Sequence, residues 1–197
     1  MYLSTSLILA SSSPRRKTLL EHLGLPFTIR KRPVNEHVSS DLAPSDVVTH
    51  LALRKAMPVA AEHPTALTLG ADTVVVHEGE ILNKPADAAD ACAMLARLSD
   101  TTHSVFTGYA LLHPATDRTV RRYARTDVTM AALSEAEIEA YVDTGSPLDK
   151  AGGYGIQDNM GPLFIKGIAG DYYNVVGLPL RSFYHTLQTD FDDLLSL

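Results

Sequence analysis

The sequence predicts an α/β protein with a mixed central sheet flanked by helices. Short apolar runs alternate with segments whose apolar residues recur at helical spacing. The most apolar run, Leu67 to Val76, contains the β-branched residues that favour a central strand. Two strands are expected in succession at 103–112 and 119–130, so the order is not a strict βαβ repeat and the sheet should be mixed.

Length and composition indicate a soluble globular protein. The chain has 197 residues, 45% hydrophobic and 20% charged, so we predict a single domain over residues 1–197. No apolar run approaches the ~20 residues that cross a bilayer, and no signal peptide is apparent, so we expect a cytoplasmic protein without a membrane partner. The single cysteine, Cys92, rules out an intrachain disulfide and is expected to be a small buried residue.

The net charge of -6 argues against nucleic acid as a partner but is compatible with a local basic pocket for one nucleotide. Such a pocket is predicted near the amino end. Leu7 to Ala10 fits a short buried strand, and Ser13 is placed to cap a helix that begins at Pro14 and ends at Gly24. Backbone N–H groups, serine hydroxyls and the run Arg15-Arg16-Lys17 would together attract a polyanion. A capped helix with a solvated basic first turn is the alternative.

The other elements are predicted from periodicity and caps. We expect strands at 26–34, 67–76, 81–82, 103–112, 119–130 and 163–168, and helices at 44–63, 87–98 and 134–143 with a last helix ending near 195. Asp87 is an expected N-cap, and Ser134 forms a capping box with Glu137. Pro58 should kink or divide its helix, because proline removes a backbone donor. The glycine-rich segment 148–157 is expected to be a loop or a strand edge.

Asp72 is the acid that most requires an explanation. It lies inside an apolar strand, where an unpaired carboxylate is costly, so it should be ion-paired, metal-bound or placed where the strand reaches a cleft. A structural salt bridge is the alternative. Glu36 offers a second carboxylate, and two carboxylates with phosphate oxygens are usual ligands of Mg²⁺. Taken alone, Glu36 is better explained as a solvated loop acid.

Several lysines lie in apolar or glycine-rich surroundings and are candidates to meet an anion: Lys55, Lys84, Lys150 and Lys166. Surface snorkelling is the alternative, and we favour it for Lys166. Gln157 closes the glycine-rich segment, where its amide can read a base edge or brace a loop. Neither GxxxxGK[ST] nor GxSxG occurs, so a P-loop and an activated serine nucleophile are not predicted.

Motifs spread along the chain occur in the order of one enzyme family: ASSSPRR at 10–16, GADTVV at 70–75, KP at 84–85, DKAGGYGIQ at 149–157 and YYNVVGLPL at 172–180. Through them the chain resembles the Maf family (septum formation inhibitor Maf), nucleoside triphosphate pyrophosphatases related in fold to ITPase-like enzymes. The resemblance implies a Maf/ITPase-like fold with a cleft between two lobes.

The resemblance also implies a reaction and a set of roles. A divalent cation, Mg²⁺ or Mn²⁺, would assist the cleavage of a nucleoside triphosphate into the monophosphate and pyrophosphate. Asp72 would accept the proton of the attacking water and, with Glu36, bind the metal. The residues implied to bind substrate are Ser11, Ser13, Arg15, Arg16, Lys55, Thr73, Lys84 and Gln157.

Arg15, Thr73 and Gln157 match the branch that is similar to dTTP/UTP pyrophosphatases, so dTTP and UTP are the expected substrates. Clearing of non-standard nucleotides, a link to cell division arrest and a homodimer are further implications. A 7-methyl-GTP pyrophosphatase is the second interpretation, and a non-hydrolysing nucleotide-binding regulator of septum formation is the third. Asn35 and Asp158 depart from the family pattern, and they put metal affinity and base preference in question.

Overall fold

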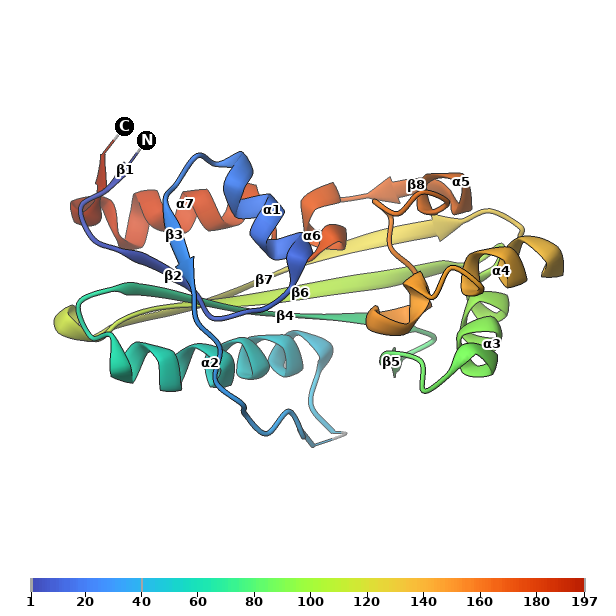
Figure 1. Cartoon of the computed structure of the whole chain (residues 1–197), viewed down its shortest axis with the longest axis horizontal. Coiled ribbons are helices and arrows are strands. Elements are labelled where there is room, and N and C mark those ends of the chain that lie inside the picture. The colour runs from blue at the N-terminus through green and yellow to red at the C-terminus, as the bar shows by residue number, and fades with distance from the viewer. Residues whose placement is uncertain (1, 40, 197) are drawn as a thin grey trace. The chain divides into compact units, whose positions relative to one another are not determined.

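Residues 2–39 and 41–196 are described by the structure, a computed structural model of the chain (Figure 1). The strands are β1 (Tyr2–Leu3), β2 (Leu7–Leu9), β3 (Phe27–Ile29), β4 (Leu67–His77), β5 (Glu80–Leu82), β6 (Thr102–His113), β7 (Arg118–Met130), β8 (Ile165–Ala169) and β9 (Leu195–Ser196). The α-helices are α1 (Pro14–His22), α2 (Pro44–Glu62), α3 (Ala88–Leu98), α4 (Glu135–Val142), α5 (Gly161–Phe164), α6 (Tyr172–Val176) and α7 (Leu180–Asp190). Short 3-10 helices are η1 (Pro114–Thr116), η2 (Ser146–Asp149), η3 (Ala151–Gly153) and η4 (Asp192–Leu194).

The central sheet is mixed, which confirms the prediction. Its strand order is β3-β2-β4-β6-β7-β8, with β5 beside β4. β2 pairs in parallel with β3 and β4, whereas β4 with β5 and β7 with β8 are antiparallel. The chain divides into two compact units: unit 1 comprises Met1–Asp72, Thr107–Ala124 and Gly177–Leu197, and unit 2 comprises Thr73–Phe106 and Arg125–Val176. The boundaries fall inside β4, β6 and β7.

In unit 1, α2 covers one face of the strands and α7 covers the other (Figure 1). Successive residues of a strand point to opposite faces, and β6 shows this at Gly108 and Tyr109. A Cβ on Gly108 would lie 2.5 Å from a backbone atom of Val48 in α2. The Tyr109 hydroxyl bonds to Thr186 of α7 at 2.8 Å. Glycine therefore lets α2 lie directly on the sheet, while an aromatic side chain fills the wider gap to α7.

The amino-terminal strand and helix form as predicted. Leu7, Ile8 and Leu9 of β2 are buried, and the N-cap of α1 is Ser13, whose hydroxyl accepts from the backbone N–H of Arg16 at 3.5 Å. Pro14 occupies the first helical position, where its missing N–H has no intrahelical role. This arrangement presents the start of α1, with its basic residues, at the end of a buried strand.

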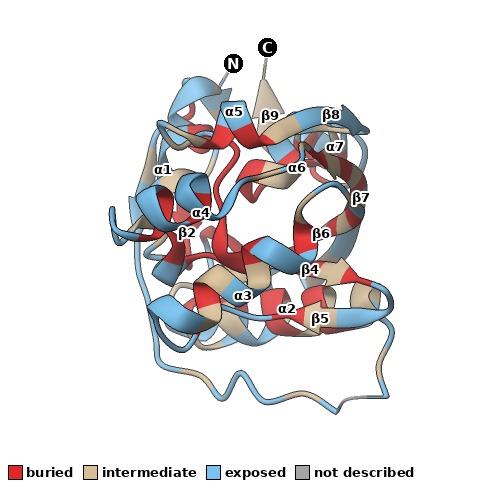
Figure 2. Cartoon of the chain, turned by 90° about the vertical axis from the view of Figure 1, so that its right-hand side faces the viewer, coloured by how far each residue is buried: buried red, intermediate tan, exposed pale blue. Residues whose placement is uncertain are grey.

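In unit 2, α3 and α4 pack against each other, and each buries one side while it exposes the other (Figure 2). Asp87 caps α3, and Ser134 with Glu137 forms the predicted capping box of α4. The rings of Tyr141 and Phe164 meet edge to face with centroids 5.2 Å apart. Unit 2 therefore has packed side chains of its own, which include these two aromatic rings.

Some predicted elements differ from the structure. Pro58 does not divide α2, which continues to Glu62 because Val59 and Ala60 just beyond it are buried against the core. The second strand is only Phe27–Ile29, and the segment 148–157 contains 3-10 turns. The last helix ends at Asp190, whose carbonyl accepts from Arg118 at 3.1 Å, and not near 195.

Cys92 is only partly buried, because it lies on α3 one residue beyond the buried position of Ala91. None of the helices in the described parts of the chain combines the length and the hydropathy that a membrane span requires.

Candidate active site

The start of α1 gathers hydroxyl and guanidinium groups from unit 1. The Arg16 guanidinium donates from Nη1 to Ser11 Oγ at 3.4 Å and from Nε to the backbone carbonyl of Gly177 at 2.9 Å. Ser11 also accepts from the backbone N–H of Ser13 at 3.2 Å, and it is buried. These contacts fix the arginine beside the helix start, where backbone N–H groups and positive charge favour an anion.

A second cluster joins a strand, a helix and a loop of the same unit. The Lys55 ammonium on α2 lies 2.6 Å from Asp72 Oδ1 on β4 and 2.9 Å from Glu36 Oε2 in the loop after β3. The exposed fractions of the side chains are 16% for Lys55, 12% for Asp72 and 60% for Glu36. Asp72 is thus nearly buried but paired, which removes the objection to a charge in an apolar strand.

Electrostatics couples the two clusters. Burial lowers the pKa of Arg16, while the charge of Asp72 raises it, Arg15 lowers it and Glu36 raises it. Arg16 therefore senses both carboxylates as well as the neighbouring arginine. Unit 1 brings together Ser11, Ser13, Arg16, Lys55, Asp72 and Glu36, as the resemblance implies.

The loop that carries Glu36 is anchored by Arg54, which follows Leu53 on α2. Its guanidinium donates to the carbonyl of His37 at 2.6 Å, and Asn35 Oδ1 accepts from the backbone N–H of His37 at 2.8 Å. The sequence does not predict a role for Arg54, and Asn35 stands out in it only as a departure from the family pattern. The only signal in the sequence is that Arg54 is a basic residue next to Lys55, because contacts with the backbone produce no sequence pattern.

The two carboxylates suit a hard divalent cation better than a soft one. Asp72 and Glu36 already converge on one positive group, the Lys55 ammonium, and they offer only oxygen ligands. Among the described residues there is no group of three or more His, Cys, Asp or Glu side chains arranged for a metal. The two carboxylates match Mg²⁺, which commonly takes one or two carboxylates and completes its shell with water and substrate phosphates.

The remaining predicted residues belong to unit 2, apart from Arg15 in unit 1. Thr73 directly follows Asp72 in β4 and is half-buried, whereas Lys84 and Gln157 are exposed. Gln157 Nε2 donates to Asp158 Oδ1 at 3.1 Å. Lys150 is buried against Asp149 and Asp158, at 2.7 and 3.2 Å, so it is held within a network of its own unit.

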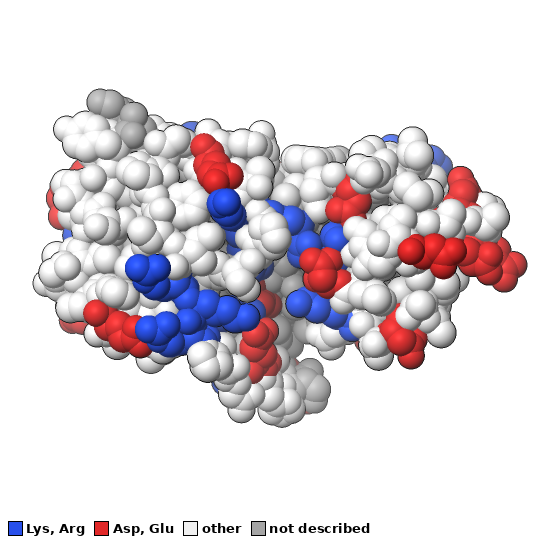
Figure 3. Space-filling view, in the orientation of Figure 1, with Lys and Arg blue, Asp and Glu red and all other residues white. Residues whose placement is uncertain are grey.

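Basic side chains also gather on the surface of unit 1 over β3 and the segment after it (Figure 3). Arg30, Lys31 and Arg32 are all exposed there, and Arg32 donates from Nε to Glu62 at 2.7 Å. They make this face locally positive although the whole chain carries a charge of -6.

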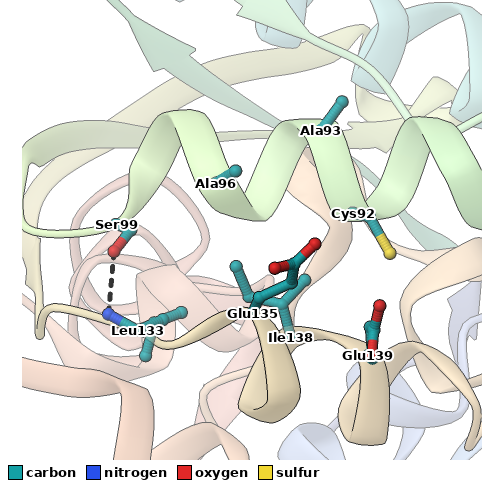
Figure 4. A pocket seen from close by; sticks show the side chains of 8 residues that line it. All are labelled: Cys92, Ala93, Ala96, Ser99, Leu133, Glu135, Ile138 and Glu139. Carbon is teal, nitrogen blue, oxygen red and sulfur yellow. Dashed lines mark hydrogen bonds between the residues drawn. The ribbon is translucent and has the colours of Figure 1, made fainter.

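A cavity of about 450 Å³ in unit 2 does not suit a phosphate (Figure 4). It lies between α3 and α4 and is lined by Cys92, Ala93, Ala96, Ser99, Leu133, Glu135, Ile138 and Glu139. Two of these residues are acidic and none is basic, so the lining would repel a nucleotide's triphosphate.

The mixed α/β fold, the basic start of α1 and the acid–lysine cluster are together typical of proteins that act on phosphorylated ligands. The family model described as Maf-like protein matches residues 6–190. The chain therefore belongs to the Maf family.

Its relatives agree with this membership. The chain is 56% identical to a Salinibacter ruber protein named dTTP/UTP pyrophosphatase, over 99% of this chain and 96% of that protein. It is 50% identical to a protein of the same name from Bacillus cereus strain AH820, over 92% and 94% of the two chains. A third such protein, from Symbiobacterium thermophilum, is 52% identical over 89% of each chain.

Two solved structures are also similar. The Ham1 protein of Staphylococcus aureus aligns with a TM-score of 0.44 and 13% identity, over 64% of this chain and 72% of that one. A HAM1 protein from Coxiella burnetii aligns with a TM-score of 0.48 and 18% identity, over 66% and 74% of the two chains.

Proposed function

We propose that this protein is a nucleoside triphosphate pyrophosphatase that hydrolyses dTTP and UTP to the monophosphate and pyrophosphate. The observation that carries the proposal is the convergence of Asp72 and Glu36 on the Lys55 ammonium, beside an arginine-bearing helix start. Phosphoryl transfer needs positioned positive charge and a base near the attacking water, and this cluster supplies both. The names of the similar bacterial proteins support the choice of substrates.

Each group of unit 1 has a distinct role in the proposal. Asp72 orients the attacking water and accepts its proton, because its carboxylate is held in place by Lys55 and is still partly exposed. Arg16, Ser11 and Ser13 bind phosphate oxygens at the start of α1. Lys55 adds positive charge for the phosphates. Mg²⁺ or Mn²⁺ held by Asp72 and Glu36 would neutralise charge on the phosphates.

The roles of four further residues depend on the family resemblance alone. We assign Lys84 to the phosphates, and Arg15, Thr73 and Gln157 to recognition of the base. Substitution of any of the four by alanine should raise KM for dTTP and UTP. For Arg15, Thr73 and Gln157, KM should rise more with these two nucleotides than with other triphosphates.

The test is release of pyrophosphate and monophosphate from dTTP and UTP with Mg²⁺ or Mn²⁺. The unaltered protein should hydrolyse both, Asp72→Asn should not, and Asp46→Asn should behave as the unaltered protein, since Asp46 is an exposed acid in the first turn of α2. A panel with CTP and 7-methyl-GTP measures base preference. Preference for 7-methyl-GTP would identify the other branch, and binding without turnover would identify a nucleotide-binding regulator.

We also propose, on the resemblance alone, a cytoplasmic homodimer that clears non-standard nucleotides and is linked to division arrest. Light scattering after gel filtration should give twice the mass of one chain, and a single-chain mass would contradict the dimer. Fluorescence of a tagged chain in cells would test the location. Deletion of the gene should raise non-standard nucleotide levels and change the length of dividing cells.

A further inference from the structure

Asp158 is the centre of a hydrogen-bond network that lies wholly within unit 2. Its Oδ2 accepts from the Tyr141 hydroxyl at 2.7 Å and the Ser146 hydroxyl at 2.6 Å, and it lies 3.2 Å from the Lys150 ammonium. These partners come from α4, η2 and the residue that follows η2. The carboxylate of Asp158 is only 14% exposed, so its position is fixed from three directions.

The direction of each hydrogen bond in this network follows from the donors available. Tyr141 O accepts from the backbone N–H of Gly155 at 3.1 Å, so its own proton points to Asp158. Burial and the neighbouring Asp158 raise the pKa of Tyr141, which keeps this proton in place. Lys150 can only donate, and it also contacts Ser146 Oγ at 3.0 Å. The Oδ2 side of Asp158 therefore faces donors.

The other carboxylate oxygen, Oδ1, faces Gln157. Gln157 Nε2 lies 3.1 Å from it, and a carboxylate can only accept, so the amide nitrogen must be the donor. Gly155 makes room for this arrangement, because a Cβ there would lie 2.7 Å from Asp158 Oδ1 and 2.8 Å from Lys150 Cε. The Gln157 amide thus has one preferred orientation, with its nitrogen toward Asp158 and its oxygen turned to the other side.

We infer that Asp158 is a positioning residue that makes Gln157 an acceptor for the base, and thereby selects uracil and thymine over cytosine. Uracil and thymine carry an N3–H donor, which can pair with the Gln157 oxygen. Cytosine carries an unprotonated N3 acceptor at the same position and would face that oxygen without a proton between them. This inference rests on the proposed function, in which Gln157 contacts the base.

The substitution Asp158→Asn tests the inference with almost no change of shape. Lys150 can only donate, so the new amide oxygen should take the Oδ2 side and the new amide nitrogen should face Gln157. Gln157 would then turn its oxygen toward residue 158 and present its nitrogen to the base. The ratio of kcat/KM for UTP to that for CTP should fall about tenfold or more, through loss with UTP and gain with CTP.

Two controls separate positioning from general damage. Asp149→Asn removes a negative charge from the same lysine, at 2.7 Å, while it keeps Asp158 and its contact with Gln157, and it should leave the UTP to CTP ratio unchanged. In a Gln157→Ala background, Asp158→Asn should no longer change the ratio. Both nucleotides are measured on one sample, so partial unfolding cancels from the ratio.

The outcomes distinguish the two proposals. If UTP is hydrolysed but Asp158→Asn lowers the rates with UTP and CTP by the same factor, the residue is merely structural and the inference is wrong while the proposed function stands. A persistent effect on the ratio in the Gln157→Ala background would overturn it as well. If the unaltered protein hydrolyses neither UTP nor dTTP, the proposed function and this inference both fail.

Discussion

Each unit holds a nearly buried lysine against two carboxylates, and the two lysines differ in what else they contact. Lys150 in unit 2 contacts the Ser146 carbonyl at 2.6 Å and the Ser146 hydroxyl at 3.0 Å as well as its two acids. In the described part of the chain, the Lys55 ammonium of unit 1 bonds to Asp72 and Glu36 alone. Four acceptors from residues close in the chain surround the Lys150 ammonium, whereas the Lys55 ammonium depends on carboxylates from distant segments.

This difference suits a structural role for Lys150 and the functional role that we propose for Lys55. The partners of Lys150 are close in sequence, and they hold the glycine-rich segment in shape. The partners of Lys55 come from a strand and an exposed loop, which suits the metal-binding role that we propose for Asp72 and Glu36. Substitution of Lys150 should therefore affect mainly stability, and substitution of Lys55 mainly nucleotide hydrolysis.

The largest expected effect is on the rate of hydrolysis. Asp72→Asn should lower kcat with dTTP roughly a thousandfold, because it removes the base. Asp158→Asn should lower kcat with dTTP far less, since we infer that Asp158 acts on the choice of nucleobase and not on proton transfer. Steady-state kinetics of both variants checks this, and equal losses of kcat would mean that the two clusters do not differ in function.

The next effect concerns stability. Lys150→Met should lower the free energy of unfolding by about 3–5 kcal/mol, because the nearly buried Asp158 carboxylate loses its positively charged partner and keeps only neutral donors. Lys55→Met should cost less, since Arg16 still faces Asp72, but it should raise KM for the nucleotide. Urea unfolding and kinetics on both variants measure the contrast. A stable Lys150→Met protein would refute the structural role.

A smaller effect is the dependence of stability on pH. Burial and the nearby His77 lower the pKa of His103 to about 4, with Asp127 opposing, while its Nε2 bonds to Tyr154. The unfolded chain takes up this proton below pH ~6.5 and the folded chain only near pH 4, so stability is lost as the pH falls through that window, by up to about 3 kcal/mol.

Urea unfolding at several pH values measures this loss. His103→Gln should flatten the curve between these pH values, because glutamine does not titrate. An unchanged slope would show that His103 is not its source.

The smallest effect is expected at an exposed pair. Arg32 and Glu62 form a bidentate contact, but their side chains are 43% and 45% exposed. Water and salt screen such a pair, so Arg32→Ala should leave the midpoint of thermal unfolding unresolved from that of the unaltered protein. Arg32→Ala is the control for the Lys55→Met and Lys150→Met variants. A clear drop in its midpoint would show that the exposure of an ion pair does not indicate its contribution to stability in this protein.

Local signals explain how much of this structure could be predicted from the sequence. The Ser13 cap, the Ser134–Glu137 capping box and the apolar strand around Asp72 depend on residues close in the chain, and the structure confirms them. The pairing of Lys55 with Asp72 depends on how α2 lies on β4, which no spacing encodes. Both residues were therefore singled out, but not as partners.

The conformation of the glycine-rich segment, in contrast, could not be predicted from local signals. The sequence indicated only a loop or a strand edge over 148–157, because glycine allows many conformations. Its actual shape follows from the contacts of Asp158, which was recognised only as a departure from the family pattern. The nearly buried Asp158 carboxylate joins α4, η2 and Lys150, and such convergence becomes visible only in three dimensions.

Gly70 has a consequence for how this enzyme tolerates change. A Cβ at this position would lie 2.2 Å from the backbone oxygen of Ala52 in α2. Ala52 lies about one helical turn before Lys55, and Gly70 lies two residues before Asp72 on β4. A single added methyl group would lift the helix and draw the ammonium away from its acid. Gly70, which has no functional side chain, thus sets the distance between α2 and β4, and under the proposed function a substitution there would impair hydrolysis without touching the site.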